Sequence, residues 1–104
     1  MDTLKVGIIG AGWMGHVHAR AYQRLAQHWP DLPRSCEIVA VADSSEPAAA
    51  AFARSHGDMA QHADWRDLLA DPSVEAVSVT APNFLHSEIG VAVAAAGKHL
   101  WIEK

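Results

Sequence analysis

Three glycines with the spacing of an anion-binding turn are the residues in this sequence best suited to chemistry. They are Gly10, Gly12 and Gly15 in the run Gly-Ala-Gly-Trp-Met-Gly, which follows a strand-forming apolar segment and precedes a helix-compatible one. Gly10 lets the chain turn sharply, Gly12 lets a pyrophosphate approach because it has no Cβ, and Gly15 lets helix and strand pack closely. The helix would also direct its unpaired N–H groups at the turn. The pattern predicts a pyrophosphate site, with an ordinary strand-to-helix loop as the alternative.

Polar residues at the ends of later strand-like segments could complete such a site. Asp43 ends one apolar segment, residues 80–83 (Thr-Ala-Pro-Asn) follow another, and Glu103 and Lys104 end a third. The carboxyl ends of parallel strands share one edge of a sheet, and ligands bind there. An aspartate in that place can accept hydrogen bonds from both hydroxyls of a ribose, and a lysine can exchange a proton with an alcohol oxygen. We therefore expect these residues to lie on one binding rim.

The segments that must position these residues alternate between strand and helix. Strands are expected near residues 5–9, 37–43, 58–62, 74–80 and 98–103, and helices near 13–28, 44–56, 64–69 and 84–96. The first helix would bury a stripe of Val17, Ala21 and Leu25, which hold helical spacing. The third strand would be short and lie at the sheet edge. This order predicts an α/β fold with a doubly wound, five-stranded parallel sheet.

Composition limits the classes of protein to which this fold can belong. The sequence has 104 residues, of which 50% are hydrophobic and 19% charged, as in a globular domain. The net charge of −4 and the lack of a basic run argue against nucleic acid as a partner. No apolar segment approaches the ~20 residues that span a bilayer, and no signal segment is visible, so we expect no membrane partner and a cytoplasmic location.

The cysteine and histidine content argues against a metal site. Cys36 is the only cysteine, so no internal disulfide can form, and we expect it to be a small buried residue. The seven histidines lack a ligand spacing: His16 and His18 are two residues apart, which places them on different faces of a helix. Surface or capping histidines are the preferred interpretation.

These motifs together resemble the N-terminal domain of the glucose-fructose oxidoreductase, inositol dehydrogenase and rhizopine-catabolism (Gfo/Idh/MocA) oxidoreductases. The resemblance covers essentially the whole chain, and its most diagnostic parts are A-P-N-F-L-H and A-G-K-H-L-W-I-E-K. They look like the family's T-P-N-x-x-H turn and its E-K-P motif, although Ala81 stands between Thr80 and Pro82. The resemblance implies a Rossmann NAD(P)-binding fold and hydride transfer between a nicotinamide cofactor and a hydroxyl or carbonyl carbon of a sugar, polyol or related small molecule.

The resemblance also implies a role for each motif position. The implied cofactor-binding residues are Gly10, Gly12, Trp13, Met14, Gly15, Asp43, Ser44, Thr80, Pro82, Asn83, His86 and Glu103. The glycines would hold the pyrophosphate, Asp43 the adenosine ribose, and the turn at Pro82 the nicotinamide side. Lys104 is the expected catalytic residue and would face the cleft, whereas Glu103 would face the other side of the sheet because strand neighbours alternate. A plain turn at Pro82 and Asn83, a helix-capping His86 and a surface Lys104 remain alternatives.

The residues that follow the expected strand near 37–43 favour NAD over NADP as the cofactor. A 2′-phosphate would bring negative charge against Asp43, and no arginine follows at positions 44–46. Ser44 and Ser45 could still donate to a phosphate if Asp43 turned away.

The chain ends at the Glu-Lys of the E-K-P motif, so we expect residues 1–104 to be a truncated dinucleotide-binding domain. The family's sixth strand and substrate domain are absent, as is the acid-base partner of Lys104. Alone, the chain should be inactive, and its uncovered sheet edge should lead to self-association or marginal stability, unless the chain is only the ordered part of a longer protein. The intact protein would be a homo-oligomer. A non-catalytic NAD(P)-sensing module is the main alternative, because it needs the glycines and Asp43 but not Lys104. A methyltransferase that uses S-adenosylmethionine ranks third.

Overall fold

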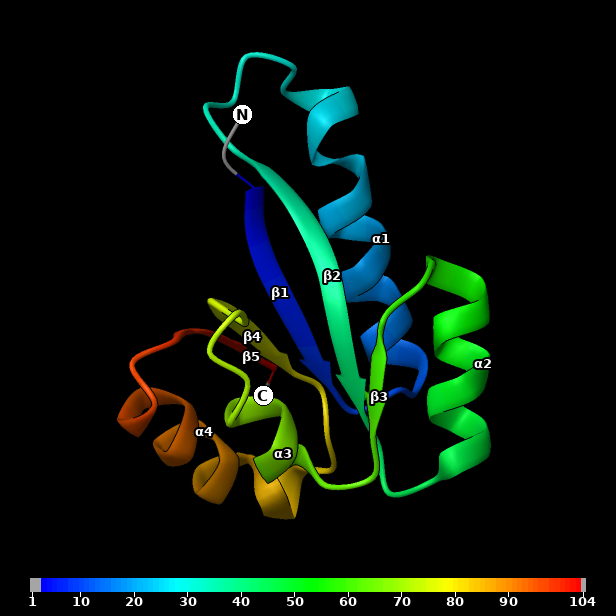
Figure 1. Ribbon diagram of the computed structural model, residues 1–104, viewed down its shortest axis with the longest axis vertical. Helices are drawn as coiled ribbons and strands as arrows, with labels where there is room; N and C mark the ends of the chain where they lie inside the picture. Colours follow the sequence, from blue (N-terminus) through cyan, green and yellow to red (C-terminus); the bar gives the residue numbers. More distant parts are fainter. Residues whose placement is uncertain (1–2, 104) are drawn as a thin grey trace.

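A five-stranded parallel sheet organises the chain (Figure 1). The computed structural model describes residues 3–103. In chain order the elements are β1 (Thr3–Ile9), α1 (Trp13–His28), β2 (Ser35–Ala42), α2 (Glu46–His56), β3 (Ala60–His62), α3 (Trp65–Leu69), β4 (Ala76–Val79), the 3₁₀ turn η1 (Asn83–Leu85), α4 (His86–Ala95) and β5 (His99–Ile102). The strand order is β3-β2-β1-β4-β5, and every pair is parallel. The doubly wound α/β fold predicted from the sequence is confirmed.

Helices cover both faces of the sheet and form two cores. Figure 1 shows α1 and α2 on one face and α3 and α4 on the other. Val6 and Ile8 of β1 point to the first face, where Phe52 of α2 is fully buried. Ile9 points to the second face, which also buries Leu68 and Ile89. Because both faces are covered, the carboxyl halves of β1 and β2, residues 6–9 and 38–42, are continuous apolar runs, as in other parallel sheets.

The packing face of α1 differs from the stripe predicted from its aliphatic residues. Gly15, His18 and Ala19 are buried, whereas Ala21 is exposed and Val17 and Leu25 are only partly buried. The prediction was wrong because small residues let α1 approach the sheet closely, and the polar ring of His18 fills the remaining space. The helix begins where expected, directly after Gly12, and it ends before Trp29-Pro30.

The amino end of the sheet is held together by Glu75, which lies in the loop before β4. Its Oε2 accepts a hydrogen bond from the Lys5 backbone N–H at 3.0 Å, and its Oε1 accepts one from Arg34 Nη2 at 3.2 Å. These contacts connect β1, the loop before β2 and the loop before β4. They lie at the opposite end of the sheet from the predicted binding residues, so this end contributes to stability.

Strand β5 lies at the edge of the sheet. Leu100, Trp101 and Ile102 are 41%, 44% and 38% exposed, although they belong to a strand that pairs with β4. Within residues 3–103, β5 has no strand partner on its outer side. In the same part of the chain, no helix combines the length and apolarity that crossing a bilayer requires.

Candidate dinucleotide-binding site

The glycine turn between β1 and α1 has the backbone geometry that an anion site needs. Gly10 has φ +101°, a conformation that favours glycine, and a Cβ there would lie 2.7 Å from backbone atoms of Thr80 and Ala81. A Cβ on Gly15 would lie only 2.2 Å from the Gly10 carbonyl oxygen. A Cβ on Gly12, in contrast, would meet nothing within 4 Å. Gly10 and Gly15 therefore shape the turn, and Gly12 leaves open space beside it.

The first turn of α1 faces this open space without a protein cap. Gly12 is the N-cap residue, no side chain bonds to the first N–H groups, and the first turn contains no acidic residue. The N–H groups of Trp13, Met14 and Gly15 have no carbonyl partner within the helix, as at every helix start. An anion placed here would meet these donors and the positive end of the helix dipole.

Asp43 joins the glycine turn to the start of α2. Its Oδ2 accepts a hydrogen bond from the Ala11 N–H, and its Oδ1 accepts one from the Ser45 N–H, both at 2.8 Å. Ser45 in turn caps α2, because its side chain accepts from the Ala48 N–H at 3.3 Å. An ionised carboxylate has about four acceptor positions, so each oxygen can still take a hydroxyl. The aspartate is thereby held in place before any ligand binds.

Two of the predicted cofactor-binding residues bond to the turns themselves. The Thr80 hydroxyl donates to the Gly10 carbonyl at 2.7 Å, and His86 Nε2 donates to the Ala81 carbonyl at 2.7 Å. Thr80 thus clamps the glycine turn to the end of β4, and His86 fixes the turn that precedes η1. Pro82 starts η1, and Asn83 is exposed.

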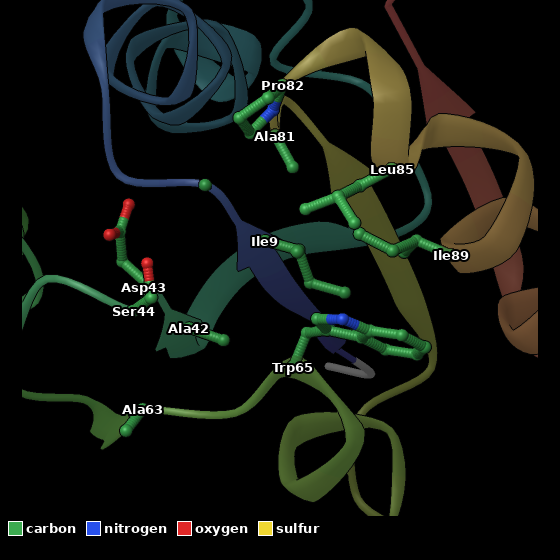
Figure 2. A pocket seen from close by; sticks show the side chains of 11 residues that line it. Ile9, Ala42, Asp43, Ser44, Ala63, Trp65, Ala81, Pro82, Leu85 and Ile89 are labelled. Atoms are coloured by element: carbon green, nitrogen blue, oxygen red, sulfur yellow. The ribbon is translucent and has the colours of Figure 1, made fainter.

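A hollow of about 190 Å³ lies beside these residues at the carboxyl ends of β1, β2 and β4 (Figure 2). Asp43 and Ser44 line one side, and Ala81 and Pro82 line another. Figure 2 shows the Trp65 ring lying across from Leu85 and Ile89, with Ile9 between them. The hollow therefore has apolar walls and a carboxylate at its edge, a combination suited to a nucleoside.

Glu103 contacts α1 through a buried histidine. Its Oε1 lies 2.9 Å from Nε2 of His18, a fully buried residue of α1. The ring of His18 stacks on Trp101 with centroids 3.7 Å apart, and its Nδ1 lies 3.0 Å from Ser78 Oγ. The sequence interpretation of His18 as a surface or capping residue was wrong, because Ser78 of β4 and Glu103, directly after β5, satisfy both of its ring nitrogens.

His16 and His56 pair with each other, and Cys36 lies apart from them. His16 Nδ1 and His56 Nε2 share a hydrogen bond of 2.7 Å, and burial, with His16 and Arg20 nearby, lowers the pKa of His56. Across residues 3–103, no group of three or more potential ligands lies close enough to hold a metal ion. Cys36 is partly buried, and this burial raises its thiol pKa.

The structure brings most of the predicted residues to one rim. The glycine turn, Asp43, Ser44, Thr80 and Pro82 meet at the carboxyl ends of the strands. Lys104, the predicted catalytic residue, lies outside the described residues. The sequence interpretation missed the hollow's Trp65 and the buried His18. No local signal pointed to Trp65, which was expected only to belong to the helix near residues 64–69.

A parallel sheet of this order, with a glycine turn after β1 and an acid after β2, defines the dinucleotide-binding class of doubly wound domains. The chain belongs to the Gfo/Idh/MocA oxidoreductases: residues 4–104 match this family, which is described as an oxidoreductase family with an NAD-binding Rossmann fold. The resemblance found in the motifs is thus confirmed, and the chain is an NAD-binding domain.

Individual relatives in this family are dehydrogenases. A levoglucosan dehydrogenase of Pseudarthrobacter phenanthrenivorans is 38% identical over 100% of the chain, and an inositol 2-dehydrogenase of Salmonella paratyphi B is 37% identical over 98%. A solved levoglucosan dehydrogenase in complex with NADH and L-sorbose has a TM-score of 0.94 at 38% identity over 100% of the chain. The chain spans 27%, 29% and 28%, respectively, of these three proteins.

Proposed function

We propose that this chain is the cofactor-binding part of an NAD-dependent dehydrogenase that oxidises a hydroxyl carbon of a sugar, polyol or related small molecule. The observation that carries the proposal is the pairing of an open Gly12 with a preplaced Asp43. Gly12 leaves room for a pyrophosphate beside the N–H groups at the start of α1. Asp43, held by the Ala11 N–H, offers its carboxylate to a ribose. The dehydrogenases among its relatives support the substrate class.

Each part of NAD would have its own contacts along the rim. The N–H groups that follow Gly12 would hold the pyrophosphate, and Asp43 would accept the adenosine 2′- and 3′-hydroxyls. The hollow beside Trp65 would take the adenine, because a planar base packs well on an indole ring and the walls are apolar. The turn at Pro82 and Asn83 would then lie toward the nicotinamide.

The chemical step would join this rim to a substrate bound beside it. A bound nicotinamide supplies the acceptor for the hydride that leaves the carbinol carbon as the carbonyl forms. The hydroxyl proton must leave the substrate oxygen in the same reaction, and we assign its acceptance to the neutral amine of Lys104. In the reverse direction the ammonium would return that proton. The partner that sets the protonation of Lys104 would come from a substrate domain.

A non-catalytic NAD-sensing module is the second candidate, because it would need the same glycine turn and Asp43. Lys104 separates the two, since a sensor has no use for an acid-base group at that strand end. In a full-length protein that carries this domain, Lys104→Ala should lower kcat by about a hundredfold or more and leave the Kd for NAD nearly unchanged. Unchanged turnover with weakened NAD binding would instead make Lys104 a cofactor ligand.

Binding of the cofactor can be tested on the chain directly. Calorimetric titration with NAD⁺, NADH and NADP⁺ should show binding of the first two and weaker binding of the third. Gly90→Ala serves as a control, because a Cβ there would make only ordinary van der Waals contacts and Gly90 of α4 does not line the hollow. Failure of the unmodified, folded chain to bind NAD⁺ or NADH would overturn the proposal.

A further inference from the structure

A chain of four hydrogen-bonded side chains runs through the α1 face of the sheet and ends at Glu103. The Tyr22 hydroxyl lies 2.6 Å from Ser78 Oγ, Ser78 Oγ lies 3.0 Å from His18 Nδ1, and His18 Nε2 lies 2.9 Å from Glu103 Oε1. His18 and Ser78 are fully buried, and the Glu103 side chain is 34% exposed. The chain therefore leads from the interior to Glu103, directly after β5.

The side chains of this chain can donate in one direction, from Tyr22 through Ser78 and His18 to Glu103. An ionised Glu103 can only accept, so His18 Nε2 must carry a hydrogen and donate it. A neutral His18 then accepts at Nδ1 from the Ser78 hydroxyl, and Ser78 Oγ accepts from the Tyr22 hydroxyl. Burial raises the pKa of Tyr22, so its phenol keeps the proton that it donates. Every polar atom along the path has a partner when His18 is neutral.

The order serine, histidine and carboxylate is also found in hydrolases, but this arrangement cannot act as one. Ser78 is fully buried in β4, so no substrate can reach its oxygen, which already contacts both Tyr22 and His18. A nucleophile must be accessible to the atom that it attacks. The chain can therefore position groups but cannot attack a substrate.

We propose that His18 is a positioning residue that holds Glu103, and with it the carboxyl end of β5, against α1. Trp101 adds to this by stacking on the His18 ring, and the Glu103 N–H bonds to the Val79 carbonyl at 3.2 Å. Because α1 begins at the glycine turn, one buried side chain links the pyrophosphate end of the site to the strand end that precedes Lys104. The contact of His18 with Glu103 is inferred from geometry alone, whereas its effect on catalysis rests on the proposed function.

Hydrogen exchange measures the link without any cofactor. His18→Phe keeps an aromatic ring but removes both ring nitrogens, so neither Ser78 nor Glu103 has a partner at this position. His18→Gln retains an amide donor near the position of Nε2. We expect His18→Phe to speed exchange of the Glu103 amide about tenfold or more relative to the β1 amides, and His18→Gln to restore part of that protection. His28→Phe, in the exposed last turn of α1, is the matched control. Equal acceleration in every strand would mean a general loss of stability and would overturn the proposal.

Nitrogen NMR of the unmodified chain gives a second measurement, which does not depend on any variant folding. We expect His18 to carry a hydrogen on Nε2, from which it donates to Glu103, and an Nε2 without a hydrogen would contradict the proposed contact. In the full-length enzyme, His18→Phe should lower kcat while leaving the KM for NAD nearly unchanged, with partial recovery in His18→Gln. Absence of NAD binding by the unmodified protein would refute the proposed function, but the exchange and NMR results would still decide the role of His18.

Discussion

The carboxylate of Asp43 accepts a hydrogen bond from the backbone N–H of Ala11 at 2.8 Å and so ties the end of β2 to the glycine turn. The residue expected to recognise the ribose therefore also shapes the pyrophosphate site. Such a contact fixes both groups before the cofactor arrives, and preorganisation of this kind reduces the entropy lost on binding.

Replacement of Asp43 tests this double role. Asp43→Ala removes a charged acceptor for the ribose and for Ala11, so the affinity for NAD⁺ should fall about tenfold or more. The affinity for NADP⁺ should fall less, because the repulsion of its 2′-phosphate is also removed. Calorimetric titration measures both, with the exposed Asp31→Ala as the control. Tighter binding of NADP⁺ than of NAD⁺ by the unmodified chain would contradict the assigned preference.

Two glycines of the same turn should respond to alanine in opposite ways. Gly15→Ala places a methyl group 2.2 Å from the Gly10 oxygen, so the free energy of unfolding should fall by about 2 kcal/mol or more. Gly12→Ala meets no protein atom and should cost less than about 1 kcal/mol, but its methyl group should block the pyrophosphate and weaken NAD⁺ binding strongly. Urea unfolding and cofactor titration separate the two effects. If Gly12→Ala bound NAD⁺ with normal affinity, the pyrophosphate could not lie beside Gly12, and the assigned site would be wrong.

The extent to which the sequence predicts this site depends on how local each signal is. The glycine turn and Asp43 were predicted correctly as members of one rim because a strand end and a turn are local features that parallel topology brings together. His18 was not predicted, because its partners Ser78 and Glu103 lie 60 and 85 residues away in the sequence. Nothing in the local sequence of α1 distinguishes a histidine whose ring nitrogens bond to distant side chains from one whose ring nitrogens bond to water. Trp65 was missed for the same reason.

The Glu75 contacts at the amino end of the sheet should make stability depend on acidity. The Lys5 N–H, followed by the Arg34 guanidinium, lowers the pKa of Glu75 below its usual value of 4.5. Because the folded pKa is below the unfolded one, this stabilisation is present above the unfolded pKa and is lost as the pH falls through the folded pKa. Urea unfolding should thus show Glu75→Gln to be less stable than the unmodified chain near pH 6, with the difference shrinking below about pH 4. Exposed Glu37→Gln is the control, and a difference that grows on acidification would contradict this account.

The exposed edge of β5 should promote association of the isolated chain. Its outer backbone groups and apolar side chains can pair with a second copy, and a lysine on an edge strand opposes such pairing. We expect sedimentation to show self-association of the chain and a shift toward monomer in Leu100→Lys. Val91→Lys on α4 removes another exposed apolar side chain without altering the edge, so it should have less effect. A monomeric unmodified chain would refute the expectation.

The parallel order also determines how the domain would respond to mechanical force. Thr3 begins β1 at the amino end of the sheet, and Ile102 ends β5 at the carboxyl end, with β4 between the two strands. Tension between these points would act along the strands, so it would load all the hydrogen bonds of a pair in shear instead of opening them one at a time. Single-molecule pulling between positions 3 and 103 should therefore meet greater resistance than pulling that peels β5 sideways from β4. The arrangement that gathers the binding residues on one rim would also let the domain transmit tension along its length.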